Sequence, residues 1–149
     1  MSKRLGVVAM MLLLIASSAI VSASEQESAV SNGGYIVLPG VFDTHKEPLG
    51  IKSVYATITQ SVTNWHTKSV SSYLTSLNID LNWGNPSNSL RLKVYSPDGY
   101  TFGPYYDSYD GTNNGRTNLD IINNNGLTQG TWHYEVYGYS VAGTQGYYI

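Results

Sequence analysis

The stretch 72–83 constrains the fold most strongly, because its apolar residues recur at every second position. Side chains of an extended strand point alternately to opposite faces, so a period of two indicates a strand with one buried face and one wet face. The predicted buried face consists of Tyr73, Thr75, Leu77, Ile79, Leu81 and Trp83. The opposite face is polar apart from Leu74.

Several further segments have strand-forming composition and lie between turns rich in Gly, Asn and Pro. Besides 72–83, the predicted strands are 35–38, 53–60, 64–70, 90–95, 119–121, 131–139 and 147–149. No stretch after residue 23 has the spacing of an amphipathic helix. Seven or eight short strands at regular spacing predict an all-β fold, an antiparallel, jelly-roll-like β-sandwich. We expect Trp65, Trp83 and Trp132 to point into its core, and His66 and His133 to point outward.

The N-terminal region has the three parts of a secretory signal peptide. Lys3 and Arg4 form a basic region, residues 5–21 are mostly apolar, and the small residues that follow allow cleavage after Ala23. The alternative is an uncleaved membrane anchor, although the apolar stretch is short against a usual span of about 20 residues. We therefore predict a signal peptide over 1–23, a flexible leader and loop over 24–50, and a β-sandwich domain over 51–149. The protein is then secreted or held at the cell surface.

Composition narrows the classes of function. The 149 residues include no cysteine, which excludes a disulfide framework, a thiolate zinc site and a cysteine nucleophile. The formal net charge is -2, and the balance of charges gives no basic footprint for nucleic acid. The expected partner is an extracellular protein or an envelope polysaccharide. We expect no nucleic-acid partner, and no membrane partner once the signal peptide is removed.

A hydrolytic site would need a nucleophile, a base and an orienting acid. The candidate bases are His45, His66 and His133, and no serine lies in a G-x-S-x-G elbow. No two histidines stand two residues apart on a predicted strand, which leaves little basis for a zinc site. We therefore predict a protein that is not an enzyme.

Three motifs follow one another in an order and spacing typical of one family. They are TQSVTNWH at 59–66, LNIDL at 77–81 with NSLRLKVYSPDG at 88–99, and QGTWHYEVYG at 129–138 with GYYI at 146–149. Over about 58–149 the chain resembles the bacterial and archaeal pre-peptidase C-terminal domains. The resemblance implies a non-catalytic, jelly-roll-like accessory domain of secreted peptidases that assists substrate or matrix binding, and some such domains bind calcium. The acidic pair that commonly precedes the family's L-x-V strand is here Asn88 and Ser89.

Calcium is the candidate cofactor, because the loop 107–115 is rich in the oxygen ligands that calcium prefers. The predicted ligands are Asp98, Asp107, Asp110 and Asn113, near Asn114 and Asp120. The loop does not have EF-hand spacing, and Asp and Asn also favour turns without any metal. A second group, nearer the N-terminus, consists of Glu25, Glu27 and Asp43.

Tyrosine is the other candidate source of function. Tyr100, Tyr105, Tyr106 and Tyr109 are the predicted binding residues, and Tyr95, Tyr137 and Tyr139 lie on predicted loops and outer faces. Exposed tyrosine rings stack on sugars or anchor a protein interface, but tyrosine also fills sheet surfaces because of its strand propensity. We predict a binding module for protein or cell-envelope polymer. The alternative is a carbohydrate-binding module, which a row of tyrosines on one sheet face would favour.

Overall fold

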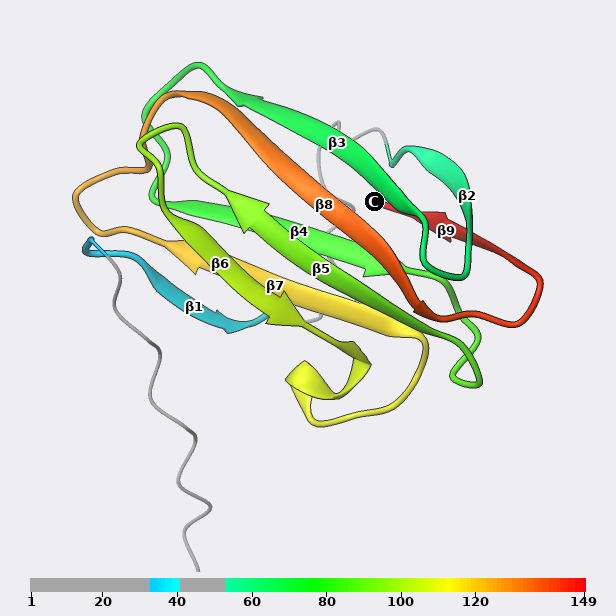
Figure 1. Cartoon of the computed structure of the whole chain (residues 1–149). Helices are drawn as coiled ribbons and strands as arrows, with labels where there is room; N and C mark the ends of the chain where they lie inside the picture. The colour runs from blue at the N-terminus through cyan, green and yellow to red at the C-terminus, as the bar shows by residue number, and fades with distance from the viewer. Residues whose placement is uncertain (1–32, 41–52) are drawn as a thin grey trace, which may run out of the picture.

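The computed structural model describes residues 33–40 and 53–149, which form two β-sheets packed face to face (Figure 1). The five-stranded sheet has the order β1-β7-β4-β9-β2, and the four-stranded sheet has the order β3-β8-β5-β6. All neighbouring strands pair antiparallel. The strands are β1 Ile36–Pro39, β2 Tyr55–Thr59, β3 Thr63–Val70, β4 Ser76–Asn82, β5 Ser89–Tyr95, β6 Thr101–Tyr105, β7 Arg116–Ile122, β8 Gly130–Ser140 and β9 Thr144–Tyr148.

The predicted antiparallel β-sandwich is confirmed, with nine strands in the described part of the chain rather than seven or eight. The extra strand is β6, in a segment that we expected to be mostly loop. Its Gly103 and Pro104 are turn-forming residues, and proline is tolerated there because β6 is an edge strand. A single turn of 3-10 helix, η1 (Asp107–Asp110), follows β6. Across 33–40 and 53–149, no helix is long and apolar enough to cross a membrane.

The core lies between the sheets and draws on both of them. Inward side chains alternate with outward ones along β4, β5 and β8, as a half-buried strand requires. The hydrophobic residues with no exposed surface are Leu81, Leu90, Leu92, Val94, Leu119, Ile121, Trp132, Val136 and Tyr147. Trp83 is 5% exposed, and its indole N–H donates to the carbonyl oxygens of Asn85 and Asn88, each at 3.0 Å.

The domain boundary predicted at residue 51 needs one correction. Strand β1 falls within the range 24–50, and it pairs with β7, with Val37 opposite Ile121. Val37 is 7% exposed, so this strand belongs to the sandwich. The predicted signal peptide over 1–23 lies outside the described residues.

The strand predicted over 72–83 is shorter than expected, because β4 begins at Ser76. Its face from Leu77 to Trp83 is buried as predicted, but Tyr73 is 67% exposed. A methyl group added at Gly126 would lie 2.6 Å from the Tyr73 ring, so this ring packs over the turn that follows β7. Tyr73 therefore fits the alternating pattern of the sequence but does not belong to the core.

The prediction for β3 is wrong, because its two faces are the reverse of those expected. Trp65 is 58% exposed, whereas His66 points inward and its Nε2 lies 2.8 Å from the hydroxyl of Tyr147 on the other sheet. Asn64 donates from Nδ2 to the same hydroxyl at 2.9 Å. Because β3 carries polar residues on both faces, its sequence pattern specifies its orientation weakly.

Replacing the two tryptophans separately tests this assignment of faces. We expect Trp83→Ala to lower the free energy of unfolding by about 3–5 kcal/mol, because it removes a buried indole. Trp65→Ala removes an exposed ring and should cost about 1 kcal/mol or less. Urea denaturation of both variants measures the difference, and equal losses would contradict the assignment.

The inward, half-buried position of His66 predicts a loss of stability in mild acid. Burial lowers the pKa of His66 below its usual 6.5. Between about pH 6.5 and that lower pKa, the unfolded chain binds a proton that the folded chain does not, so the free energy of unfolding falls with falling pH. Urea denaturation at several pH values should show a smaller fall for His66→Asn than for the wild type. The matched variant His133→Asn, at an exposed strand position, should retain the wild-type fall.

Candidate functional site

The four tyrosines predicted to bind a ligand do not form one surface. Tyr100, just before β6, packs against the ring of Tyr35, with centroids 5.5 Å apart. Tyr105 and Tyr109 form an edge-to-face pair at 4.5 Å and lie partly buried against the core. Burial raises the pKa of Tyr105 to about 12. Tyr106 packs instead against Tyr139 of β8, with ring centroids 5.0 Å apart.

The predicted calcium ligands are also separated. Asp98 precedes β6 and accepts hydrogen bonds from Tyr35 Oη and Thr128 Oγ1, each at 2.9 Å, whereas Asp107 and Asp110 follow β6. Five strand residues separate the two ends by roughly 17 Å. In the part of the chain that the structure describes, no three His, Asp or Glu side chains are grouped to hold a metal ion. Calcium binding stays a prediction from sequence, and Glu25, Glu27 and Asp43 lie outside the described residues.

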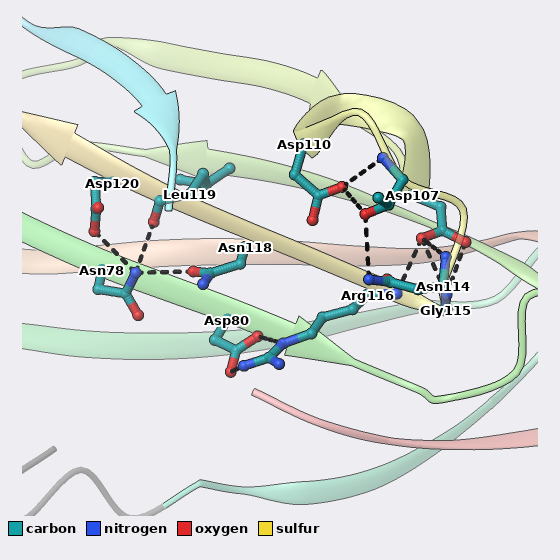
Figure 2. A network of polar contacts seen from close by, with 11 residues as sticks. Asn78, Asp80, Asp107, Asp110, Asn114, Gly115, Arg116, Asn118, Leu119 and Asp120 are labelled. Carbon is teal, nitrogen blue, oxygen red and sulfur yellow. Dashed lines mark hydrogen bonds and ion pairs between the residues drawn. The ribbon is translucent and has the colours of Figure 1, made fainter. Parts of the chain in front are cut away.

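The carboxylates of the loop after β6 hold the loop itself in place (Figure 2). Asp107 is 4% exposed and accepts hydrogen bonds from the backbone N–H groups of Asn114, Gly115 and Arg116 at 2.9–3.1 Å. Asp110 Oδ1 accepts from the backbone N–H and the hydroxyl of Thr112, while Asn113 is exposed. These bonds occupy most of the lone pairs of Asp107, so its carboxylate acts as an anchor between η1 and β7.

Removing this anchor should loosen the loop. We expect Asp107→Ala to lower the free energy of unfolding by about 2–4 kcal/mol, because it leaves several backbone N–H groups without an acceptor. Ser108→Ala, at an exposed neighbouring position of η1, is the matched control and should change stability by less than about 0.5 kcal/mol. Thermal and urea unfolding measure both. A loss below about 1 kcal/mol for Asp107→Ala would refute the anchoring role.

A more distinctive arrangement lies on the outer face of the four-stranded sheet, where β8 runs between β3 and β5 (Figure 1). Antiparallel register places Trp65 of β3 beside Glu135 of β8, and Glu135 beside Lys93 of β5. The outward residues of these three strands are either aromatic or able to form hydrogen bonds. They are Thr63, Trp65, Thr67, Ser69, Thr131, His133, Glu135, Tyr137, Tyr139, Ser89, Arg91, Lys93 and Tyr95.

Five aromatic rings form what we call the aromatic platform: Trp65, Tyr95, Tyr137, Tyr139 and Tyr106. Trp65 and Tyr95 come from the strands on either side of β8, and their ring centroids are 5.6 Å apart. Tyr139 and Tyr106 pair at 5.0 Å toward the opposite end of β8. Tyr95 lies opposite His133 of β8, and His133 is six residues from Tyr139. The platform therefore extends about 20 Å along β8. The platform therefore suits an extended ligand.

Glu135 fixes two rings of the platform, Tyr95 directly and Tyr137 through Arg91. The residue is 9% exposed, and its carboxylate accepts from Tyr95 Oη and Arg91 Nη2, each at 2.7 Å. The Arg91 guanidinium lies 4.4 Å from the centre of the Tyr137 ring, a cation–π contact. Burial raises the pKa of Glu135, but the hydrogen bonds from Tyr95 and Arg91 and the charge of Lys93 outweigh it, so the pKa lies below its usual value.

Of the five platform rings, only Tyr106 belongs to the predicted binding residues Tyr100, Tyr105, Tyr106 and Tyr109. Tyr95, Tyr106, Tyr137 and Tyr139 were expected on loops or outer faces, whereas Trp65 was expected in the core. The flanking Thr63 and Thr67 share the face of Trp65, and this polar pattern was the available indication that the face is outward. The role of Glu135 depends on partners from another strand, so no local pattern indicated it.

Together, the fold and this face define a class of protein: an antiparallel β-sandwich that presents a sheet face of aromatic and hydrogen-bonding side chains. No protein-family model matches the chain. Over 51 residues the chain is 49% identical to an uncharacterized protein of Archaeoglobus fulgidus, and the match spans 34% of this chain and 71% of that protein. The chain belongs to the same family as this archaeal protein.

Proposed function

We propose that the chain is a non-catalytic, extracellular binding module that holds a glycan along the aromatic platform. The observation that carries the proposal is the row of rings on β3, β5 and β8, set among charged and hydroxyl side chains. The signal-peptide pattern supports export, and the resemblance to pre-peptidase C-terminal domains supports an accessory role.

The chemistry of the platform favours a sugar over an apolar partner. A pyranose ring has apolar C–H faces and a rim of hydroxyl groups, so it stacks on aromatic rings while its rim forms hydrogen bonds. None of the outward residues of β3, β5 and β8 is aliphatic, whereas the centre of a protein–protein interface is usually depleted of charge and more apolar. Glu135 is largely used by Arg91 and Tyr95, which leaves Lys93 as a charged donor beside the rings.

The sheet also fixes the rings before any ligand arrives. Tyr95 is held by Glu135, and Tyr137 is held by Arg91, so binding would immobilise few additional rotamers. A protein ligand is the second candidate, because Trp, Tyr and Arg are the residue types enriched at interface hot spots. The experiment below distinguishes a glycan ligand from a protein ligand, because it offers the protein both polysaccharides and gelatin.

Retention on insoluble polymers tests the proposal. We expect the protein to be retained on at least one of cellulose, chitin and bacterial cell-wall sacculi. The double variant Trp65→Ala, Tyr137→Ala should bind at least about tenfold more weakly, because two stacking rings together contribute more than about 1.4 kcal/mol. Its melting temperature should remain within a few degrees of the wild type, since neither ring is in the core.

The matched control is Tyr73→Ala, which removes a tyrosine that is 67% exposed but lies in the connection before β4. This variant should be retained like the wild type. Equal retention of the double variant would exclude the platform as the binding site. Retention on immobilised gelatin but on none of the polysaccharides would favour the protein ligand.

A further inference from the structure

The outer side of the five-stranded sheet has a hollow at the end of β4, beside β9 and β2. Its volume is about 320 Å³, and its lining includes Tyr55, Asn82, Gly84, Gly146 and Tyr148, which define the tyrosine hollow. Register places Asn82, Tyr148 and Tyr55 in one row across the three strands. The aromatic platform lies on the other sheet and faces away from it.

Two rings in contact with each other line the tyrosine hollow. Tyr55 and Tyr148 are 60% and 53% exposed, their ring centroids are 5.1 Å apart, and their planes are tilted by 56°. The lining also includes Gly146, where an added methyl group would lie 2.5 Å from the Tyr55 hydroxyl. A side chain at this position would displace the Tyr55 ring, so glycine is required to keep the two rings in place.

The polar groups of the tyrosine hollow differ in availability. The Gln145 amide is used within the fold, since Nε2 donates to the carbonyl oxygens of Trp83 and Gly146 and Oε1 accepts from Asn88. The side-chain amide of Asn82 forms no hydrogen bond with any other described residue. It can therefore both donate to and accept from a ligand. Beyond it, Arg116 forms a bidentate ion pair with Asp80, with both distances 2.6 Å (Figure 2).

We propose that the tyrosine hollow is a second saccharide site, which takes one pyranose unit. The exposed surface of the paired rings suits a C–H face of a sugar, and the Asn82 amide suits its hydroxyl groups. The volume is at the lower end of ligand pockets, which fits one sugar unit rather than an extended chain.

The position of the second site has a consequence that rests on the proposed function of the platform. The two sites lie on the outer faces of two sheets packed about 10 Å apart, so they point in opposite directions. One module would then bind two glycan chains and bridge them. Bridging increases the retention of a module in a polymer network without any new contact.

Sugar titration of the full-length, isotope-labelled protein tests the hollow by itself. The probes are glucose, galactose, mannose and N-acetylglucosamine, each up to roughly 50 mM, well above the millimolar Kd of a weak site. We expect at least one sugar to shift the backbone amides of Gly84 and Gly146 and the side-chain amide of Asn82. Tyr148→Ala and Asn82→Ala should each weaken the effect at least about tenfold, and Tyr148→Phe should preserve it.

Trp65→Ala is the control, because it alters the platform alone and should leave the titration unchanged. Thermal unfolding shows whether each variant is folded. The proposal is overturned if no sugar shifts these amides, or if the shifts survive both Tyr148→Ala and Asn82→Ala. Loss of polymer retention in the Trp65 and Tyr137 double variant, with sugar shifts retained in the hollow, separates the two sites. The absence of polymer retention in the wild type, with sugar shifts present, would contradict the platform and leave the hollow standing.

A bridging assay completes the test. Wild-type protein bound to an insoluble polymer through the platform should capture a fluorescent, soluble glycan that ends in the sugar found by titration. Tyr148→Ala should remain on the polymer but lose this capture. Equal capture by Tyr148→Ala would refute bridging through the tyrosine hollow.

Discussion

Strand β8 contributes to both the core and the aromatic platform, and the alternation of its side chains is the constraint on which both depend. Trp132, Tyr134 and Val136 are buried against the other sheet, while His133, Glu135 and Tyr137 point outward between β3 and β5. A shift of one residue would exchange these two sets. The large buried area of the inward set therefore fixes the register that brings Glu135 beside Trp65 and Lys93.

Electrostatics then determines the state of the platform. Glu135 has a pKa below its usual value, so it stays ionised at neutral pH and keeps accepting from Tyr95 and Arg91. Its contribution to stability is present above the unfolded-state pKa of about 4.3 and is lost as pH falls through the lower folded-state pKa. The Tyr95 hydroxyl has a raised pKa because of its hydrogen bond to Glu135, and it remains a donor. The rings therefore keep their positions across the neutral range.

The sequence predicted the fold well where one face of a strand was fully apolar. The alternation of Leu77, Ile79 and Leu81 predicted their burial, and the two-sheet class followed from the number and spacing of such strands. The prediction failed for Trp65 because the hydrophobicity of this side chain indicated burial. The inward face of β3 instead carries His66, whose ring nitrogen forms a hydrogen bond with a residue of the other sheet. The hydroxyl of Tyr147 makes His66 acceptable inside, and no local pattern in β3 shows this partner.

The candidate site was less predictable than the fold, because it is built from contacts between strands distant in sequence. Among the loop tyrosines predicted to bind a ligand, Tyr100, Tyr105 and Tyr109 pack on the core, and Tyr106 joins the platform. Likewise, Asp107 of the Asp-rich loop has a structural role, because its carboxylate accepts hydrogen bonds from backbone N–H groups of the same loop. Amino-acid type shows which residues are able to bind, but register and packing decide which of them face the same way.

The low proportion of charged residues, 12%, has a structural explanation in the two outer faces. A sheet face exposed to water usually carries many charged side chains, but here Thr, Asn and Tyr occupy much of this surface. Such residues keep the surface able to form hydrogen bonds while reducing the desolvation that a ligand must overcome. The two faces differ in shape, since the platform is an open row of rings and the tyrosine hollow is a recess of about 320 Å³. The two outer faces therefore present surfaces of different shape, and the core of the sandwich lies between them.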